Sequence, residues 1–356
     1  MTTDHTAGAG LSEEQRMRYS RQMLFAPIGE AGQALLLESR VAVVGMGALG
    51  AVLANHLVRS GVGYIRLIDR DFVEPSNLQR QMLYDENDAA QSLPKAEAAA
   101  AKLRAVNSGV RIEPHVADLN PANAEALLTD VDLILDGTDN FAVRFLINDV
   151  AVKHGIPWIY GGAVSSRGVA LPIIPGETPC LRCLFGGPPE AGTVETCDTA
   201  GVIGPIIHIV ASLQAAEALK LLTGANDWLQ RKLVTTDLWH NHYAAVDVSR
   251  SRQADCPCCG GGRYEYLDSS AAGEWIHSLC GRDSVQIAPV SAKRVPLDEW
   301  AARLAPLGPV ERNPFLLKFK PDSERTLVLF PDGRVLVQGT DDPVVAKSLY
   351  ARYIGM

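Results

Sequence analysis

The sequence lacks any run of about twenty consecutive apolar residues, the length that a membrane-spanning helix requires. Its first residues are polar and have no apolar core of the kind found in secretory signals, so we expect residues 1–11 to be a disordered tail and the protein to be cytoplasmic. Basic residues are in deficit: 33 lysines and arginines stand against 41 aspartates and glutamates, for a net charge of −8. This deficit argues against nucleic acid as the main partner, because nucleic-acid binding favours a basic face.

A cluster of histidines is also missing, since the eight histidines show no metal-ligand spacing. Cysteine is present in an odd number, which in a chain without secretory features favours metal binding or catalysis over disulfides. The seven are Cys180, Cys183, Cys197, Cys256, Cys258, Cys259 and Cys280. At 356 residues, the chain is long enough for one large α/β domain and a small additional one.

A short apolar run at Val41–Val44 leads into three glycines with the spacing of a Rossmann-type loop. Gly45 suits the tight turn from strand to helix, Gly47 the close approach of backbone to a phosphate, and Gly50 the close packing of helix on strand. Asp69 follows at the end of the next apolar run, where a carboxylate can bind ribose hydroxyls. The pattern predicts a nucleotide-binding domain, and it fits nicotinamide, flavin and ATP enzymes alike.

Polar residues beyond the glycine loop separate these enzyme classes. The candidate donors to triphosphate oxygens are Asn77, Arg80, Gln81 and Lys95. Asp139 follows a buried-looking strand at 131–135, and open α/β sheets bind ligands at such strand ends. Because Mg²⁺ often takes one carboxylate together with substrate phosphates, Asp139 is the candidate magnesium ligand. An enzyme that breaks ATP between its phosphates needs this set, whereas a hydride-transfer enzyme does not.

Taken together, the motifs resemble the ThiF/MoeB-type adenylyltransferases, bacterial relatives of ubiquitin-activating enzymes. The resemblance covers roughly residues 12–262, with the motifs in family order. It rests on Arg18-Tyr-Ser-Arg21-Gln22, Gly45-Met-Gly47-Ala48-Leu-Gly50, Asp69-Arg-Asp71, Ser76-Asn77-Leu78-Gln79-Arg80-Gln81, Lys95, Asp136-Gly-Thr-Asp139-Asn140, Cys180-Leu-Arg-Cys183, Cys197 with Gly201-Val202, and Cys256-Pro-Cys-Cys259.

The resemblance implies a homodimer that binds Mg·ATP and adenylylates the C-terminal glycine of a small ubiquitin-like sulfur carrier protein ending in Gly-Gly. It implies that Arg21 reaches into the nucleotide site of the neighbouring subunit, that Asp69 holds the ribose and that Asp139 holds magnesium. Phosphate contacts are implied for Asn77, Arg80 and Lys95. The other residues expected to line the nucleotide site are Gly45, Gly47, Ala48, Gly50, Asp71, Ser76, Leu78, Gln79, Gln81 and Asn140.

This chemistry needs no histidine. A terminal carboxylate with a pKa near ~3.5 is already ionised at neutral pH, so it can attack the α-phosphate of ATP without a general base. The enzyme then has to orient the reactants and neutralise charge on the phosphates, tasks for which arginine, lysine and a metal ion are suited.

Two C-x-x-C pairs predict a structural zinc site, because four thiolates are the usual closed ligand set of zinc. The expected ligands are Cys180, Cys183, Cys256 and Cys259. The pairs lie about seventy residues apart, so zinc would staple distant segments; Cys258 is a spare thiol inside the second pair. A redox pair and ordinary buried thiols are the alternatives.

Cys197 lies in a polar stretch at 192–202, before a helix expected from about Pro205 to Leu222. A thiol on a loop near a helix start can be reactive. The resemblance implies that this position can act in sulfur chemistry, as a thioester or an acyl persulfide. A separate protein that carries a persulfide is the candidate sulfur donor, and the sequence leaves the donor open. Some family members do not need this cysteine for adenylylation, so it stays open whether Cys197 is essential for catalysis.

A composition change at the glycines of 260–262 marks the expected domain boundary, with the adenylation domain at 12–262 and a small α+β module at 264–356. Two apolar runs in the module flank Pro331–Arg334, which predicts a hairpin, and 343–353 reads as a last helix. Some relatives of the resembled family carry a rhodanese domain in this part of the chain. The segment around Cys280 lacks the loop spacing of a rhodanese active site, so we do not infer rhodanese activity. The expected architecture is a Rossmann-like ATP-binding domain with a mixed sheet and a zinc staple, plus this module.

Two other functions remain open from the sequence. A nicotinamide-dependent oxidoreductase would leave Arg80, Lys95 and Asp139 without a role. A relative that adenylates a small or RNA-attached carboxylate and then dehydrates it would use the same nucleotide residues. The pathway is open too, with thiamine and molybdopterin synthesis among the candidates.

Overall fold

The computed structural model describes residues 10–189, 195, 197–268, 275–279, 283–288 and 295–355, without the side chains of residues 197, 198 and 275–279. Most of the expected tail and Cys280 therefore lie outside the described residues, although Leu11 is buried. The chain divides into two compact units, the first formed by residues 1–197 and 202–269 and the second by residues 198–201 and 270–356.

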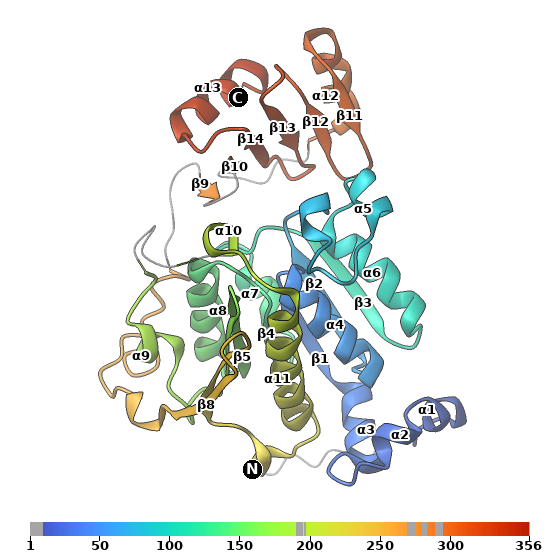
Figure 1. Ribbon diagram of the computed structural model, residues 1–356, viewed down its shortest axis with the longest axis vertical. Coiled ribbons are helices and arrows are strands. Elements are labelled where there is room, and N and C mark those ends of the chain that lie inside the picture. The colour runs from blue at the N-terminus through green and yellow to red at the C-terminus, as the bar shows by residue number, and fades with distance from the viewer. Residues whose placement is uncertain are drawn as a thin grey trace. The chain divides into compact units, whose positions relative to one another are not determined.

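The first unit is built on an eight-stranded mixed sheet with the order β3-β2-β1-β4-β5-β6-β7-β8 (Figure 1). The strands from β3 to β5 are parallel, and β6, β7 and β8 continue the sheet antiparallel. Their bounds are β1 Arg40–Val44, β2 Tyr64–Asp69, β3 Arg111–Val116, β4 Leu133–Asp136, β5 Trp158–Val164, β6 Arg167–Ile173, β7 Lys232–Asp237 and β8 His242–Asp247. The predicted mixed α/β architecture is confirmed.

Helices cover both faces of this sheet, because alternate residues of its central strands point to opposite sides. Val41 and Val43 of β1 join a core with α4, α6 and α11, whereas Ala42 and Val44 join one with α7 and α8. The helices of the first unit are α1 Glu13–Arg18, α2 Ser20–Met23, α3 Gly29–Glu38, α4 Ala48–Ser60, α5 Glu86–Ala90, α6 Lys95–Val106, α7 Ala124–Leu128, α8 Phe141–His154, α9 Leu181–Phe185 and α11 Gly204–Leu222; short 3₁₀ turns lie at Pro75–Asn77, Asn226–Trp228 and Ser249–Ser251. The short helix α10 Cys197–Ala200 belongs, except for its first residue, to the second unit.

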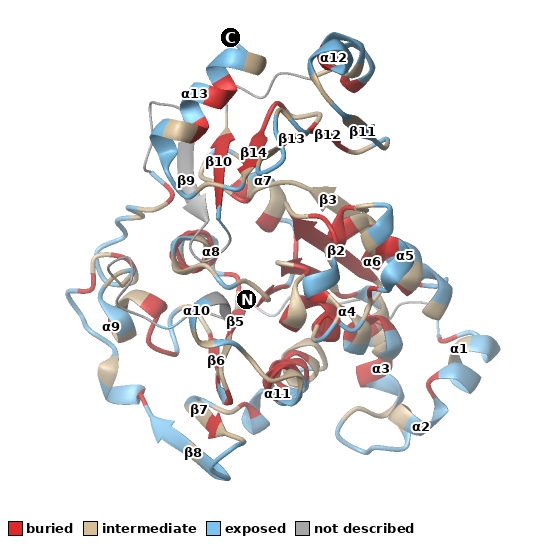
Figure 2. Cartoon of the chain, turned by 45° about the horizontal axis from the view of Figure 1, so that its top comes forward, coloured by how far each residue is buried: buried red, intermediate tan, exposed pale blue. Residues whose placement is uncertain are grey.

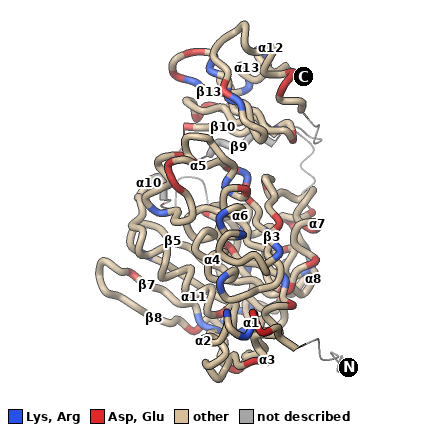
Figure 3. The backbone as a smooth tube through the Cα atoms, turned by 90° about the vertical axis from the view of Figure 1, so that its right-hand side faces the viewer, with Lys and Arg blue, Asp and Glu red and all other residues tan. Residues whose placement is uncertain are grey.

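Burial is greatest in the central strands of the sheet and least at its antiparallel end (Figure 2). Every residue of β2 and β4 is buried, whereas most of β8 is exposed. Tyr243 and Val246 of β8 are 64% and 49% exposed. The β7–β8 hairpin projects from one side of the first unit (Figure 3).

Helix α11 is long and apolar enough to cross a membrane by length and composition alone. In the first unit it packs against α4, β5 and β6, and half of its most apolar window is buried. Its fully buried Gln214 donates hydrogen bonds to the carbonyls of Asp136 and Ile159, 2.9 and 3.1 Å away. These contacts are those of a core helix. The cytoplasmic location stays a prediction.

The second unit is an antiparallel sheet with the order β11-β12-β13-β14-β10-β9 and its own apolar core. Its elements are β9 Trp275–Leu279, β10 Ser284–Ala288, α12 Leu297–Leu304, a 3₁₀ turn Ala305–Leu307, β11 Val310–Arg312, β12 Leu317–Phe319, β13 Thr326–Leu329, β14 Val335–Gln338 and α13 Pro343–Tyr353. The β13–β14 pairing confirms the hairpin predicted around residues 331–334, and α13 confirms the last helix.

Candidate functional site

The glycine loop connects β1 to α4 and has almost no room for side chains. Gly45 has a φ of +85°, and its amide donates to the Ile68 carbonyl at 2.8 Å. A Cβ atom on Gly50 would lie 1.8 Å from the Gly45 carbonyl oxygen. A Cβ on Gly47 would meet only the Gln81 amide nitrogen, at 3.9 Å. The loop is therefore closed against α4 but open at Gly47, which leaves its backbone accessible to a ligand.

Asp69 at the end of β2 is fixed by backbone amides. Its Oδ2 accepts a hydrogen bond from the Met46 amide at 2.6 Å, and its Oδ1 accepts one from the Asp71 amide at 2.7 Å. Burial raises the pKa of the Asp69 carboxyl, and the positive charge of Lys95 opposes this rise. The carboxylate thus stands beside the glycine loop at a carboxyl strand end, the position in which such folds bind a ribose.

Lys95 opens α6 and is almost fully buried, at 2% exposure. Its Nζ pairs with Asp71 Oδ2 at 3.2 Å, and its amide donates to the Asp71 carbonyl at 2.9 Å. The hydroxyl of Tyr84 donates to the carbonyls of Met46 and Lys95, at 2.6 and 3.2 Å. Tyr84 thereby ties the glycine loop to the start of α6, a role that sequence reasoning missed.

The segment around the 3₁₀ turn Pro75–Asn77 holds the next group of predicted residues. Asn77 is buried and its Oδ1 accepts a hydrogen bond from the Glu74 amide at 3.1 Å. Arg80 is partly exposed, and its guanidinium donates to the Ser76 carbonyl at 3.0 Å. Gln81 is buried, and its Oε1 has no hydrogen-bond partner among the described residues. Ser76 and Gln79 are exposed and Leu78 packs against the core.

The loop after β4 carries Asp139, whose side chain is exposed at the same edge of the sheet. The loop is fixed by a buried ion pair between Arg144 of α8 and Asp136, with Nε and Oδ2 2.9 Å apart. Arg144 also donates to the carbonyls of Thr138 and Gly161. Burial alone would lower the pKa of Arg144, but Asp136 outweighs it, so the guanidinium stays charged.

Arg144 was not among the predicted site residues, and neither was Arg70, which pairs with Asp118 at 3.0 Å. Both arginines act electrostatically on Asp139 and have their pKa values raised by it. Asn140 caps α8, because its Oδ1 accepts a hydrogen bond from the Ala142 amide at 2.8 Å, and its expected contact with the nucleotide stays a prediction. Asparagine is among the residues that most often cap the start of a helix.

Arg21 lies on α2, is exposed, and belongs to a segment far from these loops in its own chain. The neighbouring Gln22 donates to the Ser60 carbonyl at the end of α4, and Tyr19 packs under Gly61. The end of α4 and the start of β2 lie at the opposite edge of the sheet from the glycine loop. Arg21 therefore has no access to the nucleotide loops of the same chain.

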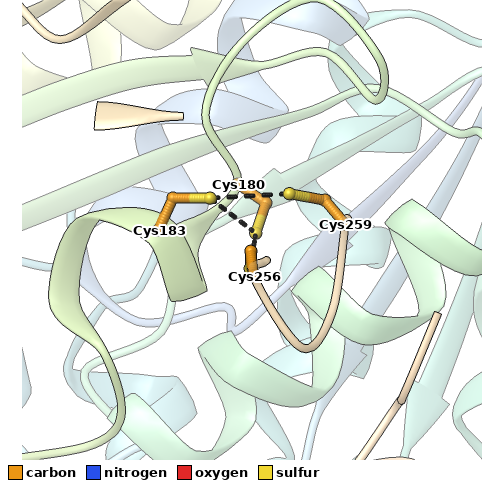
Figure 4. A group of neighbouring side chains, drawn as sticks. All are labelled: Cys180, Cys183, Cys256 and Cys259. Atoms are coloured by element: carbon orange, nitrogen blue, oxygen red, sulfur yellow. Dashed lines mark hydrogen bonds between the residues drawn. The ribbon is translucent and has the colours of Figure 1, made fainter. Parts of the chain in front are cut away.

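The four predicted metal ligands meet in one cluster between α9 and the segment after β8 (Figure 4). Their Sγ atoms all lie within 4.8 Å of one another, with Cys180–Cys183 at 3.9 Å, Cys180–Cys256 at 3.7 Å and Cys183–Cys259 at 3.5 Å. Tetrahedral zinc with Zn–S bonds of about 2.3 Å places its sulfur atoms about 3.8 Å apart. The cluster fits zinc, which would hold together segments 76 residues apart.

A cavity of about 560 Å³ lies over the antiparallel strands of the first unit. It is lined by Arg167, Gly168, Val169, Thr235, Thr236, Asp237, His240 and His242. Asp237 accepts hydrogen bonds from Ser166 at 2.8 Å and from His240 at 2.9 Å, which lowers its pKa to about 2. Cys197 opens α10, but its side chain lies outside the described residues.

The sequence matches known proteins over most of its length. A model of the ThiF family matches residues 19–258. The chain is 44% identical over 339 residues to the sulfur carrier protein ThiS adenylyltransferase of Bacillus subtilis, covering 95% of this chain and 99% of that protein. It is 39% identical to the SAMP-activating enzyme E1 of Haloferax volcanii, covering 72% and 94%. It is 41% identical to the sulfur carrier protein adenylyltransferase of Thermus thermophilus, covering 70% and 92%.

Solved structures share the fold. The crystal structure of E. coli MccB with ATP superposes with a TM-score of 0.60 at 24% identity, covering 68% of this chain and 74% of that one. The crystal structure of PaaA gives a TM-score of 0.56 at 26% identity, covering 70% and 78%.

Proposed function

Because the chain belongs to the ThiF family, we propose that it is an ATP-dependent adenylyltransferase that activates the C-terminal glycine of a ubiquitin-like sulfur carrier protein. The observation that carries this proposal is the convergence of the glycine loop, Asp69, the Lys95–Asp71 pair and Asp139 at one edge of the sheet. The named relatives support the choice of a sulfur carrier as substrate.

A ThiS-like carrier is the preferred substrate within this class. The relative named for ThiS matches 95% of the chain and so extends through the second unit. The two other relatives described above cover 72% and 70% of the chain. This difference supports a ThiS-like carrier as the substrate.

The reaction is a displacement at phosphorus. The ionised terminal carboxylate of the carrier attacks the α-phosphorus of ATP, a new P–O bond forms, and the bond to the bridging oxygen of the β-phosphate breaks, releasing pyrophosphate. Asp69 positions the ribose, and Lys95 and Arg80 neutralise phosphate charge as it moves to the leaving group. The exposed backbone at Gly47 lets the phosphates approach the start of α4, where the helix dipole is positive.

Asp139 is the proposed magnesium ligand. Its carboxylate is exposed at the carboxyl end of β4, on a loop that the Arg144–Asp136 pair holds in place. An oxygen donor beside the phosphate loop suits Mg²⁺, which prefers one or two carboxylates together with substrate phosphates. When bound, the ion would offset phosphate charge.

A homodimer completes the site in this proposal. Arg21 is exposed and lies away from the nucleotide loops of its own chain, so it can serve only a neighbouring subunit. Apolar side chains around it are exposed too, with Met17 and Leu24 at 74% and Phe25 at 61%. Such a patch beside a functional arginine suits a subunit interface.

Cys197 is proposed to act after adenylylation, in receiving the activated carboxyl or in passing sulfur from a persulfide donor. The Cys197→Ala variant should then exchange pyrophosphate with ATP normally but deliver no thiocarboxylate. Full thiocarboxylate output from this variant, measured by mass spectrometry of the carrier, would remove Cys197 from the mechanism.

ATP–pyrophosphate exchange with purified carriers that end in Gly-Gly tests the proposal. Exchange should require a carrier and should be lost in Asp139→Ala, but not in the matched control Asp227→Ala on the exposed turn Asn226–Trp228. Absence of exchange with every carrier, together with tight NAD binding, would overturn the proposal in favour of an oxidoreductase.

A further inference from the structure

Helix α8 contacts both cysteine pairs through a single side chain. Asn148 is fully buried in the middle of this helix. Its Oδ1 accepts a hydrogen bond of 2.8 Å from the amide of Leu181, the residue after Cys180. Its Nδ2 donates to the Sγ atom of Cys258, 3.3 Å away in the second pair. One amide group therefore links two segments that are 76 or more residues apart in the chain.

Cys258 is a fifth cysteine beside the cluster, and its hydrogen bonds differ from those of the other four. It is 3% exposed, and its Sγ atom accepts a hydrogen bond from Asn148 of α8. The Oδ2 atom of Asp149 accepts from the amides of Tyr266 and Leu267, at 2.8 and 3.3 Å. The second pair is thus anchored to α8 through protein groups.

The other four thiols of the cluster are arranged as a metal site would require, without any contribution from Cys258. Their sulfur atoms lie within 4.8 Å of one another, and the spacing matches tetrahedral zinc. Cys258 bonds to Asn148 of α8 instead. Its position inside the second C-x-x-C pair makes it a tether for the loop that carries Cys256 and Cys259.

We propose that Asn148 is a positioning residue for a zinc site, because it holds the two cysteine pairs in the arrangement that zinc requires. In this proposal Cys258 is the residue through which Asn148 holds the second pair, and it is not a metal ligand. The inference rests on the fit of the cysteine cluster to zinc and is independent of the proposed enzymatic function. Partners in the second shell of a metal site orient its ligands, and their loss costs about 10–100-fold in metal affinity.

The ligand assignment is tested by replacing single cysteines and measuring zinc per chain by mass spectrometry of metals. Cys258→Ala should keep one zinc per chain, whereas Cys256→Ala and Cys259→Ala should lose it. Cobalt(II) in Cys258→Ala should retain the absorption of a tetrahedral four-thiolate site. Loss of metal in Cys258→Ala with retention in Cys259→Ala would overturn the assignment and make Cys258 the fourth ligand.

The positioning role is tested by competition for zinc with a chelator. Asn148→Ala should weaken zinc binding about 10–100-fold, and Lys153→Ala, an exposed change on the same helix, should leave it unchanged. Cys258→Ala removes the other partner of the Asn148–Cys258 hydrogen bond and should also weaken zinc binding. This variant therefore tests the proposal even if Asn148→Ala fails to fold. Wild-type affinity in both anchor variants would refute the proposal.

Discussion

The nucleotide loops and the cysteine cluster differ in how their charged and polar side chains are paired. In the loops, buried charges already have partners of opposite sign, as Lys95 has Asp71 and Arg144 has Asp136. In the cluster, three close contacts join one thiol to another. Thiolates at these distances would repel one another, and a bound cation such as zinc would neutralise them.

This difference separates two ways of building a site. The nucleotide loops are placed by the sheet, because the carboxyl ends of parallel strands meet at one edge and backbone hydrogen bonds fix the turns. The cysteine cluster depends on side chains from distant segments, and zinc would add to its stability directly. Changes in one region should therefore leave the other intact.

The largest effect is expected from Arg144→Met. The substitution leaves Asp136 buried without its partner, which should lower the free energy of unfolding by about 3–5 kcal/mol. Arg40→Met is the control, because Arg40 pairs with Asp130 at the surface, with exposures of 38% and 51%, and should cost only about 0–1 kcal/mol. Scanning calorimetry gives both values, and equal losses would contradict the importance assigned to the buried pair. Zinc content should not change in either variant.

Lys95→Ala should act on catalysis rather than on the cluster. Loss of a preorganised cation at the phosphates should reduce pyrophosphate exchange by about 10²–10³-fold, with zinc per chain unchanged. Lys102→Ala, on the same helix but paired with Asp85 and Asp88, is the matched control and should retain exchange. A similar fall in both variants would mean that the effect comes from α6 and not from the phosphate contact.

The smallest effect is expected at Asn140, which caps α8 between the two regions. Asn140→Ala should destabilise the protein by about 1 kcal/mol, and Asn140→Ser should restore most of this loss, because serine also caps helices. Measurement of ATP binding in Asn140→Ser then separates the two roles. Weakened ATP binding in a variant of normal stability would show that Asn140 also contacts the nucleotide.

Local motifs made part of this structure predictable. The glycine loop, Asp69 and the four clustered cysteines were identified because each depends on short spacings and on known strand or ligand chemistry. The β13–β14 hairpin and α13 followed in the same way from turn residues and apolar periodicity. The individual roles of the nucleotide residues stay predictions, since they depend on the position of ATP.

The residues that sequence reasoning missed owe their importance to tertiary contacts. Arg144 is buried only because α8 packs across the end of β4, and Tyr84 binds two carbonyls that lie far apart in the chain. Asn148 gains its partners from two segments that fold together around the cluster. No spacing in the sequence predicts such contacts, because they arise from how helices meet the sheet.

The exposure of the outer strand β8 affects both its local opening and the substitutions that it can accept. Amides of the fully buried β2 and β4 should exchange their hydrogens only when the whole unit opens, whereas those of β8 should exchange through local fraying. A substitution on β8 therefore costs little folding energy and leaves the phosphate loops undisturbed. The sequence of β8 can thus change while the buried strands that carry the phosphate loops keep their structure.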